Sequence, residues 1–470
     1  MVFLAGFFYS VAMVLLSLPL IKVYQLENYK PLKFVSRVFK FNLAFGDKNK
    51  LVLTNRIKRY IFCEFLLFFI VFSLIFYCLT KYYLNLIVMF VGIIFLPVLM
   101  IITHYLILPA EKLIICSYIK KAKNKLKTMP CKKIAITGSF GKTSTKNILF
   151  QILSQKFKVC ATPKSYNTPM GVCKTILENL TEKDDFFIVE MGARHIGDIE
   201  FLCKLVGADY GVLTPVGNCH IETFKTLENV ENTKFEICEN VQDFMIINAK
   251  SDSNKKLYER CEKKKYLIGE ENSFAYATNV NVKNLKTYFN LHIESQSIEV
   301  STNLLGKASV DNIVTASALA YLLGVNLLDI KKGISLLKAI PHRMELIKGY
   351  ANIIDDSYNS NFEGFKQALD VLSKFHAKKI LVTPGMVELG DKQFDMNFEI
   401  AKLVAKVCDI VVVMNEVNYK AIIEGLKAKN FDMKNVYHAK SRKEQKEILK
   451  KILQANDIVL FENDLPDNYK

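Results

Sequence analysis

The stretch that most limits the fold of this chain is 134–146, IAITGSFGKTSTK. It combines a short apolar strand, a glycine-bearing turn and the start of a helix. Gly138 and Gly141 lie where backbone amides can approach a phosphate closely. Lys142 then supplies a point charge, and Thr143 supplies a hydroxyl that could reach a metal ion. The stretch therefore predicts a phosphate-binding turn between a strand and a helix.

The spacing of the two glycines sets this turn apart from the widespread phosphate-loop pattern. That pattern has four residues between its glycines, whereas only Ser139 and Phe140 lie between them here. An ordinary glycine-rich turn is the alternative interpretation. The Lys-Thr pair directly after the second glycine and the strand before the first favour nucleotide binding.

The pattern after about residue 130 predicts an α/β fold, because apolar strands alternate with helical stretches as in a parallel sheet with crossover helices. Strands are expected at 133–137, 186–191, 210–214 and 243–248, followed by an antiparallel edge within 258–299. Further strands are expected at 351–355, 379–383 and 410–414, and helices at 362–375, 398–407 and 443–453. The second group predicts a smaller, doubly wound α/β domain at the C-terminal end.

The first 110 residues contain three apolar runs, and each is long enough to cross a bilayer as a helix. They are residues 2–21, 61–79 and 83–108. Because only residues 80–82 separate the second run from the third, these two should form a hairpin, and Pro97 interrupts the third run. Glu64 could be a functional intramembrane acid, but its place near a helix end favours an interfacial position.

The formal net charge of +17 is unevenly distributed. Residues 1–130 hold 17 Lys/Arg and 4 Asp/Glu, whereas the rest of the chain holds 46 and 42. The excess lies beside the apolar runs, above all in the loop 22–59, as the positive-inside rule expects for segments in the cytoplasm. Aromatic residues among its lysines suggest an interfacial amphipathic segment in this loop, so membrane lipid is an expected partner. The near-neutral remainder disfavours a nucleic-acid partner.

Membrane topology follows from the same pattern. Three spans would place the N-terminus outside and everything after about residue 109 in the cytoplasm. The chain has eleven cysteines and no C-x-x-C pair, which fits reduced thiols in a cytosolic body and supports neither a disulfide framework nor a zinc site.

Three polar residues beyond the turn are candidates for the same site. Glu190 closes an expected parallel strand, where an acid can point into the ligand crevice and hold Mg²⁺ opposite the phosphate turn. A strand-end acid in solvent is the alternative. His220 follows another strand end and Lys234 lies on the next helix. Taken singly, a histidine or a lysine in such a place is more often structural.

Eight segments in order along residues 131–400 form a specific set. They are TGSFGKTSTK at 137–146, SYNTPMGV at 165–172, VEMGARHIGDI at 189–199, HIE…TKFEI at 220–237, LLG…DNIVTASALA at 304–320, PHRMELI at 341–347, DDSYNS at 355–360 and GMVELGD at 385–391. With these segments the sequence resembles the Mur ligase family, the ATP-dependent amide ligases of peptidoglycan precursor synthesis. The segments at 189–199, 355–360 and 385–391 are most similar to the branch that adds D-Ala-D-Ala.

The resemblance implies an ATP site shared by two domains. The phosphates would lie on the turn made of Gly138, Ser139, Phe140, Gly141, Lys142, Thr143 and Ser144. Asn312 matches the residue that contacts the adenine in the family. Arg343 and Asp356 match residues of the C-terminal domain that close onto ATP.

The resemblance also implies the metal and substrate contacts. The residues matching the family's Mg²⁺ ligands, with two ions expected, are Thr143, Glu190, His220 and Lys234, the last as a carbamate. The residues implied to act in catalysis are Lys142, Lys234, His220 and Arg343. The residues implied to lie near the substrates are Asn167, Tyr358, Asn359 and Glu388.

The expected organisation is a membrane anchor at 1–115, a central ATP-binding domain at 116–339 and a C-terminal domain at 340–470. The implied reaction adds D-Ala-D-Ala to UDP-MurNAc-tripeptide through an acyl phosphate, at the inner face of the bacterial cytoplasmic membrane. Family members usually carry a UDP-binding domain where this chain has its apolar runs. A membrane-tethered paralogue that joins a different amino compound to a cell-envelope substrate is therefore the alternative. Other wall-synthesis enzymes are further candidate partners.

A non-catalytic membrane scaffold is the third interpretation. It would predict decay of the phosphate and metal motifs, whereas Lys142, Thr143, Glu190 and His220 are all present.

Overall fold

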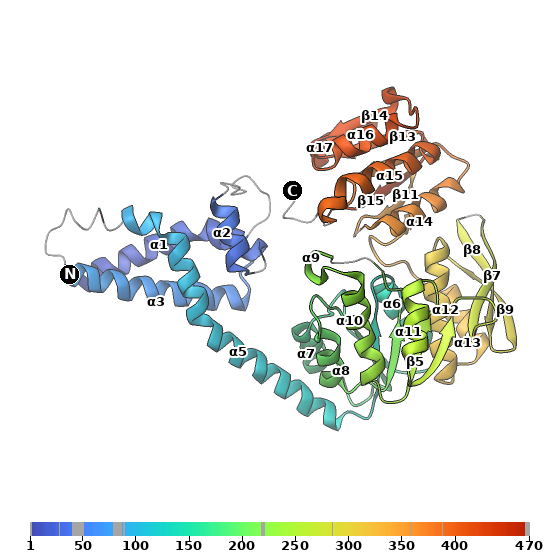
Figure 1. The fold of residues 1–470 in the computed structure, drawn as a ribbon, viewed down its shortest axis with the longest axis horizontal. Coiled ribbons are helices and arrows are strands. Elements are labelled where there is room, and N and C mark those ends of the chain that lie inside the picture. The colour runs from blue at the N-terminus through green and yellow to red at the C-terminus, as the bar shows by residue number, and fades with distance from the viewer. Residues whose placement is uncertain are drawn as a thin grey trace. The chain divides into compact units, whose positions relative to one another are not determined.

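The computed structural model describes residues 2–27, 29–39, 51–78, 87, 90–217, 221–283, 285–358, 360–387 and 389–465. They group into two compact units (Figure 1). One comprises residues up to Ser117 together with the C-terminal end from Leu465, and the other runs from Tyr118 to Asp464.

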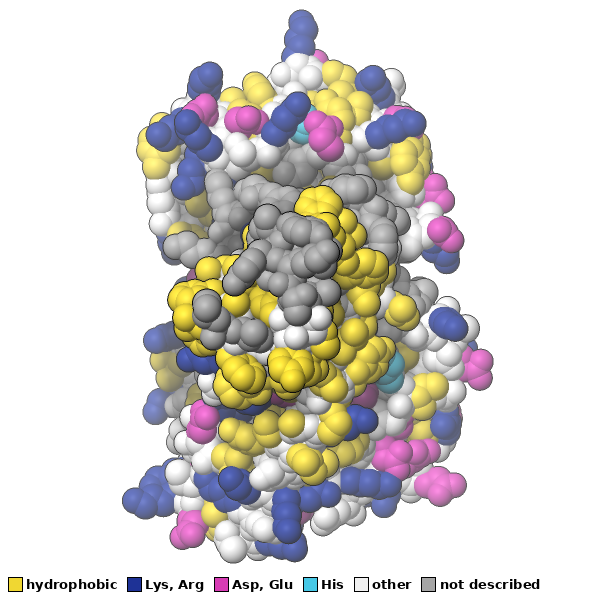
Figure 2. Space-filling view, turned by 90° about the vertical axis from the view of Figure 1, so that its left-hand side faces the viewer, with side chains coloured by type: hydrophobic (Ala, Val, Ile, Leu, Met, Phe, Trp, Pro, Cys, Tyr) yellow, Lys and Arg dark blue, Asp and Glu magenta, His cyan; other side chains and the backbone are white. Residues whose placement is uncertain are grey.

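The N-terminal unit is helical. Its elements are α1 (Val2–Leu26), α2 (Pro31–Phe39), α3 (Asn55–Cys78) and the first part of α5 (Leu96–Thr128). Among the described residues, three helices (α1, α3 and α5) are long and apolar enough to cross a membrane. Many of their large apolar side chains are exposed, and hydrophobic side chains gather over these helices in Figure 2.

The third apolar helix differs from the predicted run 83–108. Residues 90–94 are helical, Phe95 lies in a turn, and α5 begins at Leu96 and continues to Thr128. Pro97 therefore lies in the first turn of α5, where its missing N–H has no helical partner to lose. The helix continues beyond the apolar run because the lysines that follow have high helix propensity although they are not apolar. The predicted link 80–82 lies outside the described residues.

Glu64 does not lie near a helix end, the placement from which an interfacial position was expected. It is fully buried, and its Oε2 accepts a hydrogen bond of 2.8 Å from Ser17 Oγ of α1. The reason is that α3 begins at Asn55, well before the apolar run, so Glu64 lies inside the helix and not at its end. In the basic loop, α2 buries Phe34 and exposes Lys33, as an amphipathic helix does.

The α/β unit holds two sheets. The first has nine strands in the order β2-β3-β1-β4-β5-β6-β7-β8-β9, and its neighbours are parallel from β2 to β7 and antiparallel from β7 to β9. Its strands are β1 (Lys132–Thr137), β2 (Val159–Ala161), β3 (Phe186–Glu190), β4 (Tyr210–Leu213), β5 (Phe244–Asn248), β6 (Lys264–Ile268), β7 (Ala275–Lys283), β8 (Lys286–Ile293) and β9 (Gln296–Thr302). The predicted parallel sheet and its antiparallel edge are confirmed.

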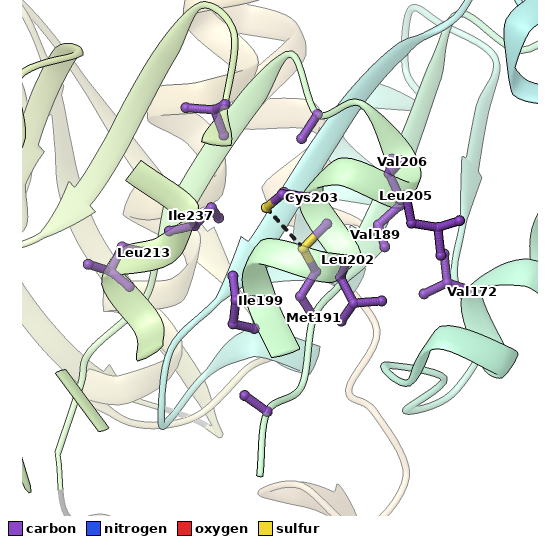
Figure 3. Packing of buried hydrophobic residues seen from close by; sticks show 14 of the residues in the cluster. Val172, Val189, Met191, Ile199, Leu202, Cys203, Leu205, Val206, Leu213 and Ile237 are labelled. Carbon is purple, nitrogen blue, oxygen red and sulfur yellow. Dashed lines mark hydrogen bonds between the residues drawn. The ribbon is translucent and has the colours of Figure 1, made fainter. Parts of the chain in front are cut away.

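Helices cover both faces of this sheet. They are α6 (Lys142–Leu153), α7 (Pro169–Glu178), α8 (Asp198–Val206), α9 (Ile221–Phe224), α10 (Leu227–Asn240), α11 (Asp252–Arg260), α12 (Lys307–Leu322) and α13 (Leu327–Ser335). Strand β3 shows the layering, because its side chains alternate between faces. Phe187 and Val189 pack with α7, α8 and α10, and Figure 3 shows Val189 among side chains of these helices. Phe186 and Ile188 pack with α6 and α12.

The second sheet, in the C-terminal part, has the order β10-β11-β15-β12-β13-β14, and only β10 and β11 pair antiparallel. Its strands are β10 (Glu345–Ile347), β11 (Asn352–Asp356), β12 (Lys379–Thr383), β13 (Ile410–Met414), β14 (Val436–Ala439) and β15 (Ile458–Glu462). Its helices are α14 (Phe362–Ser373), the short 3-10 turn η1 (Gly390–Lys392), α15 (Gln393–Val407), α16 (Tyr419–Lys427), the 3-10 turn η2 (Met433–Asn435) and α17 (Arg442–Ile452). The sequence did not predict β15, although it lies between β11 and β12 in this sheet.

Candidate functional site

The phosphate turn leaves the carboxyl end of β1 in a conformation that requires its two glycines. Gly138 has φ +143° and Gly141 has φ +80°, in the left-handed region. A Cβ on Gly138 would lie 2.6 Å from the Thr214 carbonyl oxygen, and one on Gly141 would collide with Asn312 Oδ1. Neither position therefore accepts a side chain without a shift of its neighbours.

The middle of the turn is tied to the segment that follows β4. The N–H groups of Ser139 and Phe140 donate to the Pro215 carbonyl at 2.9 and 3.1 Å. A helix has no internal acceptors for the N–H groups of its first turn, so the start of α6 at Lys142 is a place where an anion can bind. Lys142 Nζ donates to the Gly138 carbonyl at 2.8 Å, so the ammonium lies over the turn.

Glu190 ends β3 beside β1, with Ile136 as its register partner, and is buried. Its Oε1 accepts from Thr143 Oγ1 at 3.0 Å and from Asn167 Nδ2 at 3.2 Å. Its Oε2 lies 3.1 Å from Lys146 Nζ. The alternative of a strand-end acid in solvent is therefore wrong. The carboxylate and the Thr143 hydroxyl form a pair of hard oxygen ligands that fits Mg²⁺.

Lys146 was not singled out from the sequence. It lies three residues after Thr143 on α6, so both side chains share one helix face. Its side chain is fully buried, and burial lowers its pKa while the charge of Glu190 opposes that shift. The sequence could have indicated it, because a lysine three residues after Thr143 on a helix lies on the same face as the Thr143 hydroxyl.

Lys234 lies on α10, is buried and lines the same pocket as Glu190. Glu236 of α10 holds this helix against the N-terminal end of α8. Its carboxylate accepts hydrogen bonds from the N–H groups of Gly197, Ile199 and Glu200 at 2.7, 3.1 and 2.9 Å. Burial raises the pKa of Glu236, and these N–H bonds oppose the shift. The contacts fix the loop after β3 relative to Lys234.

The C-terminal sheet contributes Arg343 and Tyr358. The Arg343 guanidinium lies 4.2 Å from the Tyr358 ring centroid, and its Nη2 donates to Thr143 Oγ1 at 3.4 Å. Tyr358 Oη and Ser165 Oγ share a hydrogen bond of 2.7 Å. Side chains from this sheet therefore contact both the phosphate turn and the loop before α7.

The turn that carries Arg343 is held by acids at the end of β11. His342 and Met344 on either side have φ +65° and +48°. Asp356 Oδ1 accepts the Met344 N–H at 3.1 Å, and Asp355 Oδ2 lies 2.8 Å from His342 Nδ1. Burial raises the pKa of Asp356 to about 6, and the charge of Arg343 opposes the shift. Asp356 thus orients the Arg343 turn.

These groups surround one pocket of about 610 Å³. The predicted site residues among its lining are Gly138, Ser139, Phe140, Gly141, Lys142, Thr143, Asn167, Glu190, Lys234, Arg343 and Tyr358. Ser144, Asn312 and Asp356 are not in that lining. The positions of His220, Asn359 and Glu388 lie outside the described residues.

Asn312 lies behind the phosphate turn. Its Oδ1 accepts a hydrogen bond of 3.1 Å from Thr145 Oγ1 and blocks the space beside Gly141. In this structure it therefore supports the turn, and its predicted adenine contact stays a prediction.

Two family models match the chain. The Mur ligase middle domain matches residues 136–320, and the domain described as "Mur ligase, glutamate ligase domain" matches residues 342–462. The chain belongs to the Mur ligase family. Each match contains part of the pocket: the phosphate turn and Glu190 lie in the first, and Arg343 lies in the second.

Named relatives and solved structures agree with this assignment. The chain is 32% identical over 269 residues to UDP-N-acetylmuramoyl-tripeptide–D-alanyl-D-alanine ligase of Escherichia coli, with 56% of this chain and 59% of the relative covered. It is 28% identical over 346 residues to the enzyme of that name from Bacillus subtilis, with 72% and 74% covered. The crystal structure of MurF ligase from Thermotoga maritima in complex with ADP superposes with a TM-score of 0.67 at 25% identity, covering 74% of this chain and 80% of that one.

Two further pocket residues of this Mur ligase were missed from the sequence. Arg194 and His195 follow β3 in the loop fixed by Glu236, and both line the pocket with exposed side chains. Their place directly after the Glu190 strand end was the available signal, because residues after parallel strands face the ligand crevice.

The described residues contain no group of three His, Cys, Asp or Glu side chains that could hold a metal ion. The predicted ligand set includes His220, which lies outside those residues.

Proposed function

We propose that this chain is an ATP-dependent amide ligase of peptidoglycan precursor synthesis that adds D-Ala-D-Ala to UDP-MurNAc-tripeptide. The observation that carries the proposal is one pocket lined by the phosphate turn, by the buried acid Glu190 and by Arg343 of the C-terminal sheet. A glycine turn with a strand-end acid suits many nucleotide-using enzymes. The contribution of Arg343 and the similarity to ligases of this name favour the amide ligase.

The proposed reaction has two steps. A carboxylate oxygen of the peptide attacks the γ-phosphorus of ATP, the bond to the β-phosphate oxygen breaks, and acyl phosphate and ADP form. The dipeptide amine, after losing a proton, attacks the acyl carbon. The C–N bond forms, the C–O bond to phosphate breaks, and inorganic phosphate leaves.

The residues present suit the first step, which needs positioning and charge neutralisation more than covalent catalysis. The first-turn amides of α6 would bind phosphate oxygens at the positive end of the helix. Lys142 would move its ammonium from the Gly138 carbonyl to those oxygens. Arg343, 3.4 Å from Thr143 Oγ1, would add a second cation from the C-terminal sheet.

Thr143 and Glu190 are the described residues that would hold Mg²⁺, since their oxygens lie 3.0 Å apart at the base of the turn. Mg²⁺ bound there would neutralise charge on the phosphates. We also propose His220 as a ligand and Lys234 as a carbamate. A carbamate would convert a buried cation into an anion suited to a second Mg²⁺ ion, which gives a reason for a lysine in this pocket.

The substrates would meet between Asn167 and Tyr358, which both line the pocket. Asn167 holds Glu190 by a hydrogen bond of 3.2 Å, and Tyr358 reaches across to Ser165. Asn359 and Glu388 remain proposed neighbours of the incoming dipeptide.

We propose in addition that α1, α3 and α5 anchor the enzyme in the bacterial cytoplasmic membrane with the ligase domains in the cytoplasm. The length and apolarity of these helices and the basic loop between α1 and α3 support this topology. A green fluorescent protein fused at the C-terminus should fluoresce and stay with carbonate-washed membranes. Alkaline phosphatase activity of a C-terminal phosphatase fusion would contradict the orientation.

The experiment for the activity is phosphate release by the purified full chain with ATP, UDP-MurNAc-tripeptide and D-Ala-D-Ala. Release should require all three substrates and should be lost in Lys142→Ala, which keeps its fold because the side chain is partly exposed at the turn. Lys174→Met, at an exposed lysine of α7, is the matched control and should retain activity. Substantial ligation by Lys142→Ala would contradict the assignment.

A second candidate is a membrane-tethered paralogue that joins a different amino compound to a cell-envelope substrate. The observation that favours it is that helices long and apolar enough to cross a membrane precede the family match, which begins at residue 136. Phosphate release with a lipid-linked peptide or another amine, but not with UDP-MurNAc-tripeptide and D-Ala-D-Ala, would select this candidate.

A further inference from the structure

We propose that Lys146 is a positioning residue that holds the Glu190 carboxylate and the loop 163–168 in one arrangement. It deepens the proposed function by naming the group that orients the acid of the phosphate site.

The first observation is the burial of the ion pair. The side chains of Lys146 and Glu190 are each 1% exposed, and Nζ lies 3.1 Å from Oε2. Removing an ammonium and a carboxylate from water is costly, and a pair of this kind stabilises a fold little compared with apolar residues of similar size. Stability alone therefore gives no reason for a lysine here, whereas fixing the position of Glu190 does.

The second observation is that the same ammonium donates to the carbonyl oxygen of Lys164. Lys164 has φ +48°, a left-handed conformation that is strained for a lysine and needs support from its surroundings. Lys146 is thus bonded both to the end of β3 and to the loop that runs from β2 to α7.

Two of the residues by which the loop 163–168 lines the pocket connect it to other parts of the site. Asn167 Nδ2 donates to Glu190 Oε1 at 3.2 Å, and Ser165 Oγ shares a bond of 2.7 Å with Tyr358 Oη of the C-terminal sheet. Through one ammonium, the acid of the central sheet is therefore connected to the contact with the C-terminal sheet.

The two oxygens of the Glu190 carboxylate have different neighbours. Oε2 lies 3.1 Å from the Lys146 ammonium, whereas Oε1 accepts hydrogen bonds from Thr143 and Asn167, which both line the pocket. Lys146 itself does not line the pocket. It therefore acts through Glu190 and the loop and does not touch the reacting atoms.

The test is hydrogen exchange of Lys146→Met, which keeps most of the side-chain length and removes the ammonium, in the full chain without nucleotide. Two amides report on the loop: Tyr166 N–H, bonded to the Pro163 carbonyl at 3.0 Å, and Gly192 N–H, bonded to the Asn167 carbonyl at 2.9 Å. Loss of the charge-assisted bond to Lys164 should speed their exchange about 10- to 100-fold. Unchanged exchange at both amides would overturn the proposal.

A second variant separates positioning from the cost of an unpaired buried charge. Lys146→Met with Glu190→Gln removes both charges, so it should fold even where the single variant does not. If Lys146 positions the loop, exchange at Tyr166 and Gly192 stays fast in the double variant. The Lys164 carbonyl still lacks the hydrogen bond that Lys146 donates in the parent. Recovery of wild-type exchange in the double variant would overturn the proposal.

Steady-state kinetics give an independent readout. Lys146→Met should lower kcat about 100-fold through misplacement of Glu190, with the KM for ATP changed less than about threefold because Lys146 is outside the pocket. Lys174→Met is the matched control and should change neither. An unchanged kcat would contradict the positioning role. Since exchange is measured without substrates, it remains valid if the proposed substrates are wrong.

Discussion

Replacement of Gly141 by alanine tests the geometry of the phosphate turn. At φ +80° an alanine costs about 1–2 kcal/mol for the left-handed conformation. Its Cβ would also displace Asn312, whose Oδ1 accepts the Thr145 hydroxyl at 3.1 Å, and loss of that bond costs about 0.5–1.5 kcal/mol. The turn observed here should therefore be disfavoured by roughly 1.5–3.5 kcal/mol in Gly141→Ala.

If nucleotide binding requires this turn, that cost appears in the affinity for ADP. We expect a loss of roughly 10- to 400-fold, measured by calorimetry on the detergent-solubilised full chain. Gly324→Ala is the matched control, because Gly324 also has positive φ (+90°) but a Cβ there would meet nothing within 4 Å. It should lose stability and keep ADP affinity. In an Asn312→Ala background, where that bond is already lost, Gly141→Ala should cost only about 1–2 kcal/mol, the cost of the left-handed conformation.

The reasoning would be refuted if Gly141→Ala bound ADP within about threefold of the wild-type affinity. It would also be refuted if Gly324→Ala lost as much ADP affinity as Gly141→Ala, because the effect would then come from general destabilisation of the central domain.

Three further predictions concern the pocket and its support. Lys234→Ala should be inactive and regain part of its activity with added short-chain carboxylates, which phosphate release will show; full activity of the plain variant would remove the carbamate. Arg343→Ala should lower kcat/KM about 100-fold, whereas Tyr358→Phe should lose at most about tenfold, and equal effects would argue against a phosphate role for Arg343. Burial raises the pKa of Asp356 to about 6, so ionising this carboxyl destabilises the folded state. The loss of stability is absent below the ordinary pKa near 4 and complete above pH 6. Asp356→Asn should therefore gain stability over the parent as pH rises from 4 to 6 in thermal melts, and a constant difference across that range would contradict this linkage.

The parts of the fold that sequence reasoning predicted are those with a strong local pattern. The strands beside the phosphate turn are short, apolar and bounded by glycine or acidic residues, so β1, β3, β4 and β5 were placed within about two residues of their observed ends. The apolar helices were likewise found from length and hydropathy. Their ends were not, since helix propensity continues past the apolar residues in α5.

What escaped prediction depends on contacts between distant residues. Strand β15 consists of four apolar residues followed by Glu462, and its central place in the second sheet follows from pairing that no local pattern encodes. Lys146 looked like one more surface lysine on α6. Its role emerges only when Glu190 and the Lys164 carbonyl, both distant in sequence, are brought to its ammonium.

The predicted site shows the same division. Gly138, Gly141, Lys142 and Glu190 were identifiable because each residue type has a specific use at a strand end or helix start. Asn312 was predicted from family resemblance, but its observed contact is with the back of the turn.

The transfer of oxygen between substrate and phosphate tests the central claim most directly. The full chain would be supplied with ATP, D-Ala-D-Ala and UDP-MurNAc-tripeptide carrying ¹⁸O in the reacting carboxylate. Ligation through an acyl phosphate predicts one ¹⁸O atom in each inorganic phosphate released, because the C–O bond to phosphate breaks as the amide forms. Amide product accompanied by unlabelled phosphate would contradict the account.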